Sequence, residues 1–163
     1  MSALTPPPGD ESVPELAQLV AEEIERHGPI SFARFMQLVI AHPEYGYYAT
    51  SSERPGYGGD FLTAPETHPI FGSVLARQVL EMWTHLGSPP ELTLREYGAG
   101  RGLLARQIMA AISASGQAGL ERVRYQLIDL ARDEDGPEED FGPFEGVVIA
   151  NEFLDALPFH RLI

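Results

Sequence analysis

Three glycines in the middle of the chain alternate with other residues, at Gly98, Gly100 and Gly102. They follow an apolar, strand-like stretch at 92–94 and precede a helix-like stretch at 103–109, which predicts a strand-to-helix turn. Such turns bind nucleotide-like ligands, because glycines let the backbone bend and approach a ligand, and the helix start offers unpaired N–H groups. For the motif alone, a glycine-rich loop without a ligand is an equally good interpretation.

The spacing of the glycines narrows the class of ligand. A dinucleotide fingerprint, G-x-G-x-x-G, needs glycine at its sixth position, where this chain has Leu103. A phosphate-binding P-loop needs lysine, and the sequence contains none. Glu96 precedes the first glycine by two positions and suits a ligand that is cationic or rich in hydrogen-bond donors. S-adenosylmethionine, with an ammonium and a sulfonium group, is such a ligand, and a nicotinamide cofactor is the weaker alternative.

Two further β-prone runs end at polar residues. The run 123–129 ends at Asp129, and the run 146–150 is followed by Asn151 and Glu152. Ligands of open α/β sheets lie beyond the carboxyl ends of the strands, so we expect these side chains to share one crevice with the glycine turn. A carboxylate at Asp129 suits the ribose hydroxyls of a nucleoside, although a solvated strand end would look the same.

The composition describes a folded and strongly acidic protein. With 163 residues, 44% of them hydrophobic, the chain is long enough for a domain with its own core. Its formal net charge is −13 and its eleven basic residues are all arginine, so we do not expect binding to nucleic acid or to an anionic membrane. An arginine-bearing segment of another protein fits this charge, and surface acidity for solubility fits it equally well.

No metal site, disulfide or membrane segment is expected. The sequence has no cysteine, and its five histidines form no His-x-x-x-His pair. Residues 1–11 contain three consecutive prolines and two acids, without the basic start or the apolar run of a signal peptide or membrane anchor. We interpret them as a disordered lead-in and expect a cytoplasmic location.

Amphipathic patterns predict a helical segment over residues 12–90. Helices are expected to begin near Ser12, at Ser31 and between Thr67 and Pro69. A loop at 42–66, rich in aromatic residues and glycine, separates the second helix from the third. Loops of that length inside a compact domain are usually functional or disordered, and the aromatic residues favour an ordered loop.

Four motifs along the chain are similar to those of one known family. HPEYGYY begins at His42, GGDFLTAPE at Gly58, EYGAGRG at Glu96 and ANEFLDALP at Ala150. In this order and at these separations they resemble the MidA-like family of S-adenosylmethionine-dependent methyltransferases, over roughly residues 28–161. That family includes the mitochondrial assembly factor of respiratory complex I, which methylates an arginine of a complex I subunit.

The resemblance implies a fold, a cofactor and a substrate. The fold is α/β, a Rossmann-like class I methyltransferase core over residues 91–163, preceded by the helical segment whose loop covers the cofactor. The methyl acceptor is a protein arginine side chain. The predicted cofactor-binding residues are Gly59, Asp60, Phe61, Thr63, Pro65, Glu96, Gly98, Gly100, Gly102 and Asp129.

Polar residues after the third strand are predicted to act on the methyl acceptor. Glu152 and Asp155 are placed to hold a guanidinium through paired hydrogen bonds, and Asn151 adds a neutral orienting group. An equally good interpretation is helix capping, with Asn151 as the N-cap and the two acids in the first helical turn.

The chain is shorter than the family pattern at two places. Sixteen residues, mostly acidic, glycine or proline, separate Asp129 from Gly146, and they do not resemble a helical crossover. The sequence also ends at Ile163, soon after the third strand. We therefore expect an incomplete core, for which a catalytically incomplete binding or assembly module is the alternative to an enzyme. Exposed strand edges would also permit a homodimer.

Overall fold

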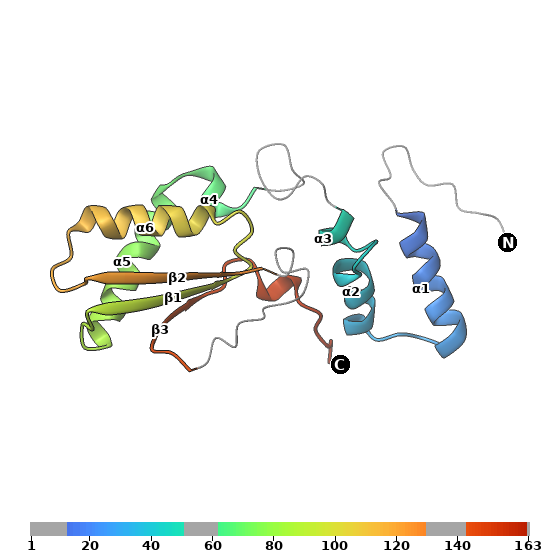
Figure 1. Ribbon diagram of the computed structural model, residues 1–163. Coiled ribbons are helices and arrows are strands. Elements are labelled where there is room, and N and C mark those ends of the chain that lie inside the picture. Colours follow the sequence, from blue (N-terminus) through green and yellow to red (C-terminus); the bar gives the residue numbers. More distant parts are fainter. Residues whose placement is uncertain (1–12, 51–61, 130–142, 163) are drawn as a thin grey trace. The chain divides into compact units, whose positions relative to one another are not determined.

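A computed structural model of the protein describes residues 13–50, 62–129 and 143–162 (Figure 1). The lead-in predicted over residues 1–11 and most of the acidic stretch before Gly146 lie outside these ranges. Within them, the strands and helices predicted around the glycine turn are all present.

The chain divides into two compact units. One comprises residues 1–52 and 157–163, and the other comprises residues 53–156. The sequence-based boundary lies instead between residues 90 and 91, which groups the third predicted helix with the N-terminal segment. The two divisions differ because an apolar stripe predicts that a helix is buried on one side, but not which partner it packs against.

The first unit is helical in its described part. Its helices are α1 (Pro14–His27), α2 (Phe32–Ala41) and α3 (Tyr47–Thr50). α2 begins after Ser31 as predicted, because the Ser31 hydroxyl accepts a hydrogen bond from the N–H of Arg34. Arg34 also donates to Glu23 of α1 at 2.8 Å, which ties the two helices together. α1 begins after Val13 without a side-chain cap.

The second unit is a parallel sheet with helices. Its elements are α4 (Ala64–Thr67), α5 (Ile70–His85), β1 (Glu91–Tyr97), α6 (Leu103–Ser115), β2 (Arg122–Ile128), β3 (Gly146–Ile149) and the 3-10 turn η1 (Leu154–Ala156). The strand order is β2-β1-β3, and both pairings are parallel. β2 and β3 thus lie on opposite sides of β1. Ligands of open α/β sheets bind where the strand order reverses in this way, at the carboxyl end of the central strand.

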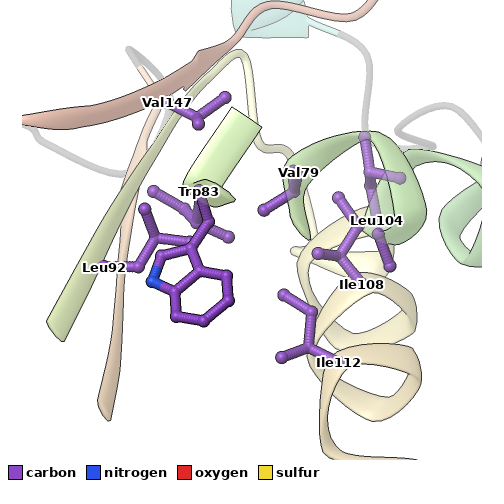
Figure 2. Close-up of a cluster of buried hydrophobic side chains, with 9 residues drawn as sticks. Val79, Trp83, Leu92, Leu104, Ile108, Ile112 and Val147 are labelled. Carbon is purple, nitrogen blue, oxygen red and sulfur yellow. The ribbon is translucent and has the colours of Figure 1, made fainter. Parts of the chain in front are cut away.

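The buried core lies between the sheet and the helices α5 and α6 (Figure 2). Leu92 and Leu94 of β1 are fully buried there. Trp83 of α5 lies in the same cluster, and its indole N–H donates to the Pro89 carbonyl at 2.7 Å, so its polar atom is satisfied. The cluster also contains Ala76, Val79, Leu104, Ile108, Ile112 and Val147. This packing fixes both ends of the segment that carries the glycine turn.

The opposite face of the sheet is more polar. Arg95 of β1 is only 8% exposed, and its Nε donates to Gln126 of β2 at 3.0 Å. Its guanidinium carbon lies 4.0 Å from the centre of the Phe144 ring, a cation–π contact. Val148 of β3 is 55% exposed, so this outer strand presents an apolar side chain to solvent.

Candidate functional site

The glycine turn joins the carboxyl end of β1 to the start of α6. Gly98, Gly100 and Gly102 have φ angles of +69°, +50° and +68°, in the left-handed region that strains any other residue type. The N–H groups of Gly98 and Ala99 both donate to the carbonyl of Ile128, at 2.8 and 3.3 Å, and the N–H of Gly102 donates to the Ala99 carbonyl at 2.8 Å. The turn is therefore held to the end of β2 by backbone hydrogen bonds.

The three glycines have different surroundings. A Cβ atom at Gly98 would lie 2.7 Å from the ring of Phe153, and one at Gly102 would lie 3.1 Å from Leu127. A Cβ atom at Gly100 would meet no atom of the described residues within 4 Å. Gly98 and Gly102 thus permit close packing within the protein, whereas the described residues leave space beside Gly100 that a ligand can enter.

Glu96 forms the floor of the site at the end of β1. It is only 4% exposed, and its Oε2 accepts a hydrogen bond from the Tyr125 hydroxyl at 2.8 Å. Burial raises the pKa of Glu96; the Tyr125 hydrogen bond opposes that shift, and the nearby Asp129 carboxylate adds to it. Burial and the Glu96 charge also raise the pKa of Tyr125 far above its usual value, so its hydroxyl remains a donor.

Asp129 follows β2 and is attached to the turn directly. Its Oδ2 accepts a hydrogen bond from the Gly100 N–H at 2.5 Å. Because a carboxylate has further acceptor positions, a carboxyl group held in this place can also accept from hydroxyl groups of a ligand. The predicted acid of the second strand is thus fixed beside the glycine that faces open space.

The segment before α5 closes on itself through a capping box. Thr63 donates to Glu66 Oε2 from its N–H at 2.9 Å and from its hydroxyl at 3.1 Å. Burial of Glu66 favours its protonated form, but the Thr63 donors and the Arg101 guanidinium outweigh it and lower the pKa of Glu66. The Thr63 side chain, predicted to contact the cofactor, therefore has a structural partner within its own segment.

The same segment is tied to the glycine turn and to α6. Arg101, inside the turn, forms an ion pair with Glu66 Oε1 at 2.9 Å. Gln107 of α6 donates to the carbonyl of Pro65 at 2.7 Å. Thr63 and Pro65 thus belong to the framework around the turn, whereas the other three cofactor residues predicted in this region, Gly59, Asp60 and Phe61, lie outside the described residues.

The polar residues after β3 begin at the same edge of the sheet. Ile149, the last residue of β3, is paired with Glu96, and Asn151 and Glu152 follow it in a turn. Glu152 has a φ of +49°, a strained conformation for a side chain of its size. The helical turn that follows, η1, starts only at Leu154, so Asn151 does not act as its N-cap. Glu152 and Asp155 are both exposed.

Two site residues were missed by the sequence analysis. Tyr125 reaches Glu96 from the neighbouring strand, and Phe153 packs against Gly98 and lies 5.9 Å from the Tyr97 ring. Because side chains alternate between the two faces of a strand, the sequence alone could have placed Tyr125 on the same face of β2 as Asp129. The register that brings its hydroxyl to Glu96 is visible only in the structure.

Within the described ranges, no helix is both long and apolar enough to cross a membrane. Nor are three or more His, Cys, Asp or Glu side chains of these ranges grouped so as to hold a metal ion.

A parallel α/β sheet with a left-handed glycine turn and carboxylates after two strands defines a Rossmann-like nucleoside-binding core. Residues 74–136 match the model of a family described as "Putative S-adenosyl-L-methionine-dependent methyltransferase". The mitochondrial protein arginine methyltransferase NDUFAF7 homolog of Drosophila melanogaster is 30% identical over 90% of this chain, and that of Danio rerio is 34% identical over 69%. A Burkholderia thailandensis crystal structure with bound S-adenosyl-homocysteine superposes with a TM-score of 0.68 and 34% identity over 96% of the chain.

These similarities confirm the predicted resemblance to the MidA-like family of S-adenosylmethionine-dependent methyltransferases. The predicted fold class is also confirmed, and the ligand of the Burkholderia structure, S-adenosyl-homocysteine, is the demethylated form of the predicted cofactor. The chain spans less than half the length of these relatives: 41% of the Drosophila protein, 26% of the Danio protein and 46% of the Burkholderia protein.

The expected cytoplasmic location is contradicted, because the relatives with arginine methyltransferase names are mitochondrial proteins. The expectation rested on the composition of residues 1–11, which carries no information about the compartment of the protein.

Proposed function

We propose that this chain binds S-adenosylmethionine at the carboxyl end of β1 and takes part in methyl transfer to an arginine side chain of a protein. The observation that carries the proposal is the open space at Gly100, bordered by the buried Glu96 and by Asp129. Glu96 supplies negative charge for a cationic ligand, and Asp129 offers acceptors for ribose hydroxyls. The residues present therefore fit the cofactor of the family.

The cofactor supplies an electrophilic methyl group, and the acceptor must be held and deprotonated beside it. Glu152 and Asp155 follow β3 and are exposed, so they are accessible to a guanidinium from another protein. Carboxylates bind guanidinium groups through paired hydrogen bonds and can accept the proton that the nitrogen loses. Asn151 remains the proposed orienting group. The net charge of −13 favours approach of a basic substrate segment.

Two finer points belong to the same proposal. The resemblance of the four motifs to a family that includes a complex I assembly factor supports a respiratory-complex subunit as the protein substrate. The exposed Val148 of β3, an edge strand of the sheet that the described residues form, supports a homodimer. Because the chain covers under half of its relatives, a binding or assembly module without turnover is the second candidate.

A transfer assay separates the two candidates. The purified chain is incubated with radiolabelled S-adenosylmethionine and an arginine-rich protein, alongside Glu152→Gln and Asp155→Asn variants. The proposal predicts labelled methylarginine with the parent chain, a large loss with each variant, and equal S-adenosylhomocysteine affinity for all three chains. Binding without any labelled arginine would favour the assembly module. Thermal stabilisation by NAD rather than by S-adenosylhomocysteine would refute the cofactor assignment, since a ligand at a hundredfold excess over its Kd adds roughly 2.7 kcal/mol.

A further inference from the structure

We propose that Tyr125 is a positioning residue, whose hydroxyl fixes the Glu96 carboxylate in an oriented, ionised state at the floor of the cofactor site. The proposal rests on the function proposed above and adds a residue of β2 to a site otherwise built from the turn and the strand ends.

The first support is the burial of Glu96. A carboxylate that is 4% exposed needs hydrogen-bond donors in place of water, and the Tyr125 hydroxyl is such a donor at 2.8 Å. This hydrogen bond occupies Oε2 and sets the rotation of the carboxyl group. The position of Oε1, the second carboxyl oxygen of Glu96, is fixed with it.

The second support is the way β2 presents the hydroxyl. Tyr125 pairs with Leu94, two positions before Glu96 on β1, so both side chains project to the same face of the sheet. The Tyr125 side chain packs against the hydrophobic core, next to Leu94 and its neighbours. A ring held by packing cannot turn away from Glu96 without disturbing the core, so the hydroxyl is preorganised.

The third support is electrostatic. Among the described residues, the ionisable groups that act on Glu96 are Tyr125 and Asp129. Burial, the larger influence, and the negative charge of Asp129 both raise the pKa of Glu96 and favour its neutral form, whereas the Tyr125 hydrogen bond stabilises the ionised form. Loss of the hydroxyl would therefore leave Glu96 neutral over a wider pH range and remove the charge that attracts a cationic ligand.

The test combines a titration without ligand and a binding measurement. Carbon-13 NMR of the Glu96 carboxyl group gives its titration midpoint in the parent chain and in Tyr125→Phe. Calorimetry between about pH 5.5 and 8 gives the affinity for S-adenosylhomocysteine, which keeps the ammonium group. We expect the Tyr125→Phe midpoint to rise by about one pH unit. The affinity loss should then be largest at the acid end of this range, where it approaches about tenfold at most, and should disappear toward the alkaline end, where Glu96 is ionised in both chains.

A double-mutant cycle separates positioning from general structural damage. In a Glu96→Gln background, Tyr125→Phe should change neither the affinity nor its pH dependence further, because the group it acts on is no longer ionisable. An unchanged Glu96 midpoint, or an affinity loss that is equal at all pH values and additive with Glu96→Gln, would overturn the positioning role. Absence of binding by the parent chain would overturn the proposed function and the positioning role with it, and the NMR titration would then report only the hydrogen bond.

Discussion

Replacing Gly100 with alanine tests whether open space in the glycine turn serves a ligand. Gly100 has a φ of +50°, and an added Cβ atom would meet no atom of the described part of the chain within 4 Å. Gly116, which ends α6, has a φ of +60° and likewise no described atom within 4 Å of an added Cβ, so Gly116→Ala is a matched control. Each substitution introduces one residue with a Cβ atom into a left-handed conformation, at a cost of about 1–2 kcal/mol in the free energy of unfolding.

The two variants should differ in their affinity for the ligand but not in their stability. An added methyl group in a filled site typically costs about 1–3 kcal/mol, which corresponds to roughly a 5- to 150-fold loss of affinity. We expect this loss in calorimetric titration of Gly100→Ala with S-adenosylhomocysteine, and no loss for Gly116→Ala. Urea unfolding should show similar destabilisation of both.

Equal affinities of the two variants would refute the reasoning, because the extra methyl group of Gly100→Ala would then lie where no ligand passes. A much larger stability loss for Gly100→Ala alone would show that its surroundings are not open as described.

Three further predictions concern the residues around the turn. Burial raises the pKa of Glu96, so the contribution of this group to stability is lost as the pH rises through its folded-state pKa. Urea unfolding of Glu96→Gln should therefore show a gain in unfolding free energy over the parent that widens from pH 5 to pH 8, and its cofactor affinity should be weaker but measurable. Glu66→Ala should lower the unfolding free energy by about 0.5–2 kcal/mol through loss of the capping box. Arg101→Ala should lower it by less than about 1 kcal/mol, because the Arg101 side chain of the ion pair is 56% exposed, although that of Glu66 is not; the reverse order would contradict this. Gly98→Ala should lower the unfolding free energy more than Gly116→Ala, because its Cβ atom would lie 2.7 Å from the ring of Phe153. Adding Phe153→Leu to Gly98→Ala should restore part of the difference. Equal unfolding free energies of the two alanine variants would exclude the collision.

The sequence allowed the elements around the turn to be predicted, because each has a local signature. Apolar runs predicted β1, β2 and β3, and the alternating glycines predicted unusual backbone angles, which Gly98 with a φ of +69° confirms. The start of α2 at Ser31 follows from local capping chemistry in the same way.

Features that depend on tertiary packing could not be predicted. Gly98 and Gly102 are needed where Phe153 and Leu127 pack, and both contacts join parts of the chain that are distant in sequence. The hydrogen bond from Tyr125 to Glu96 depends on strand register, which hydrophobic patterns alone do not determine for a strand between two others.

The roles assigned to Asn151, Glu152 and Asp155 remain predictions. The structure gives Glu152 a strained φ of +49° and places all three after the carboxyl end of β3. Strained backbone conformations of this kind cluster at functional sites, which supports testing Glu152 first.

The most direct test of the cofactor site is a nitrogen-15 NMR titration of the purified chain with S-adenosylhomocysteine. The account predicts saturable shifts of the amide signals of Gly98, Gly100 and Gly102, while the similarly left-handed glycines Gly87 and Gly116 stay unmoved. A parallel titration with NAD should move none of these signals. Unchanged signals of the turn at millimolar S-adenosylhomocysteine, or shifts caused by NAD instead, would contradict the claim that the turn after β1 binds S-adenosylmethionine.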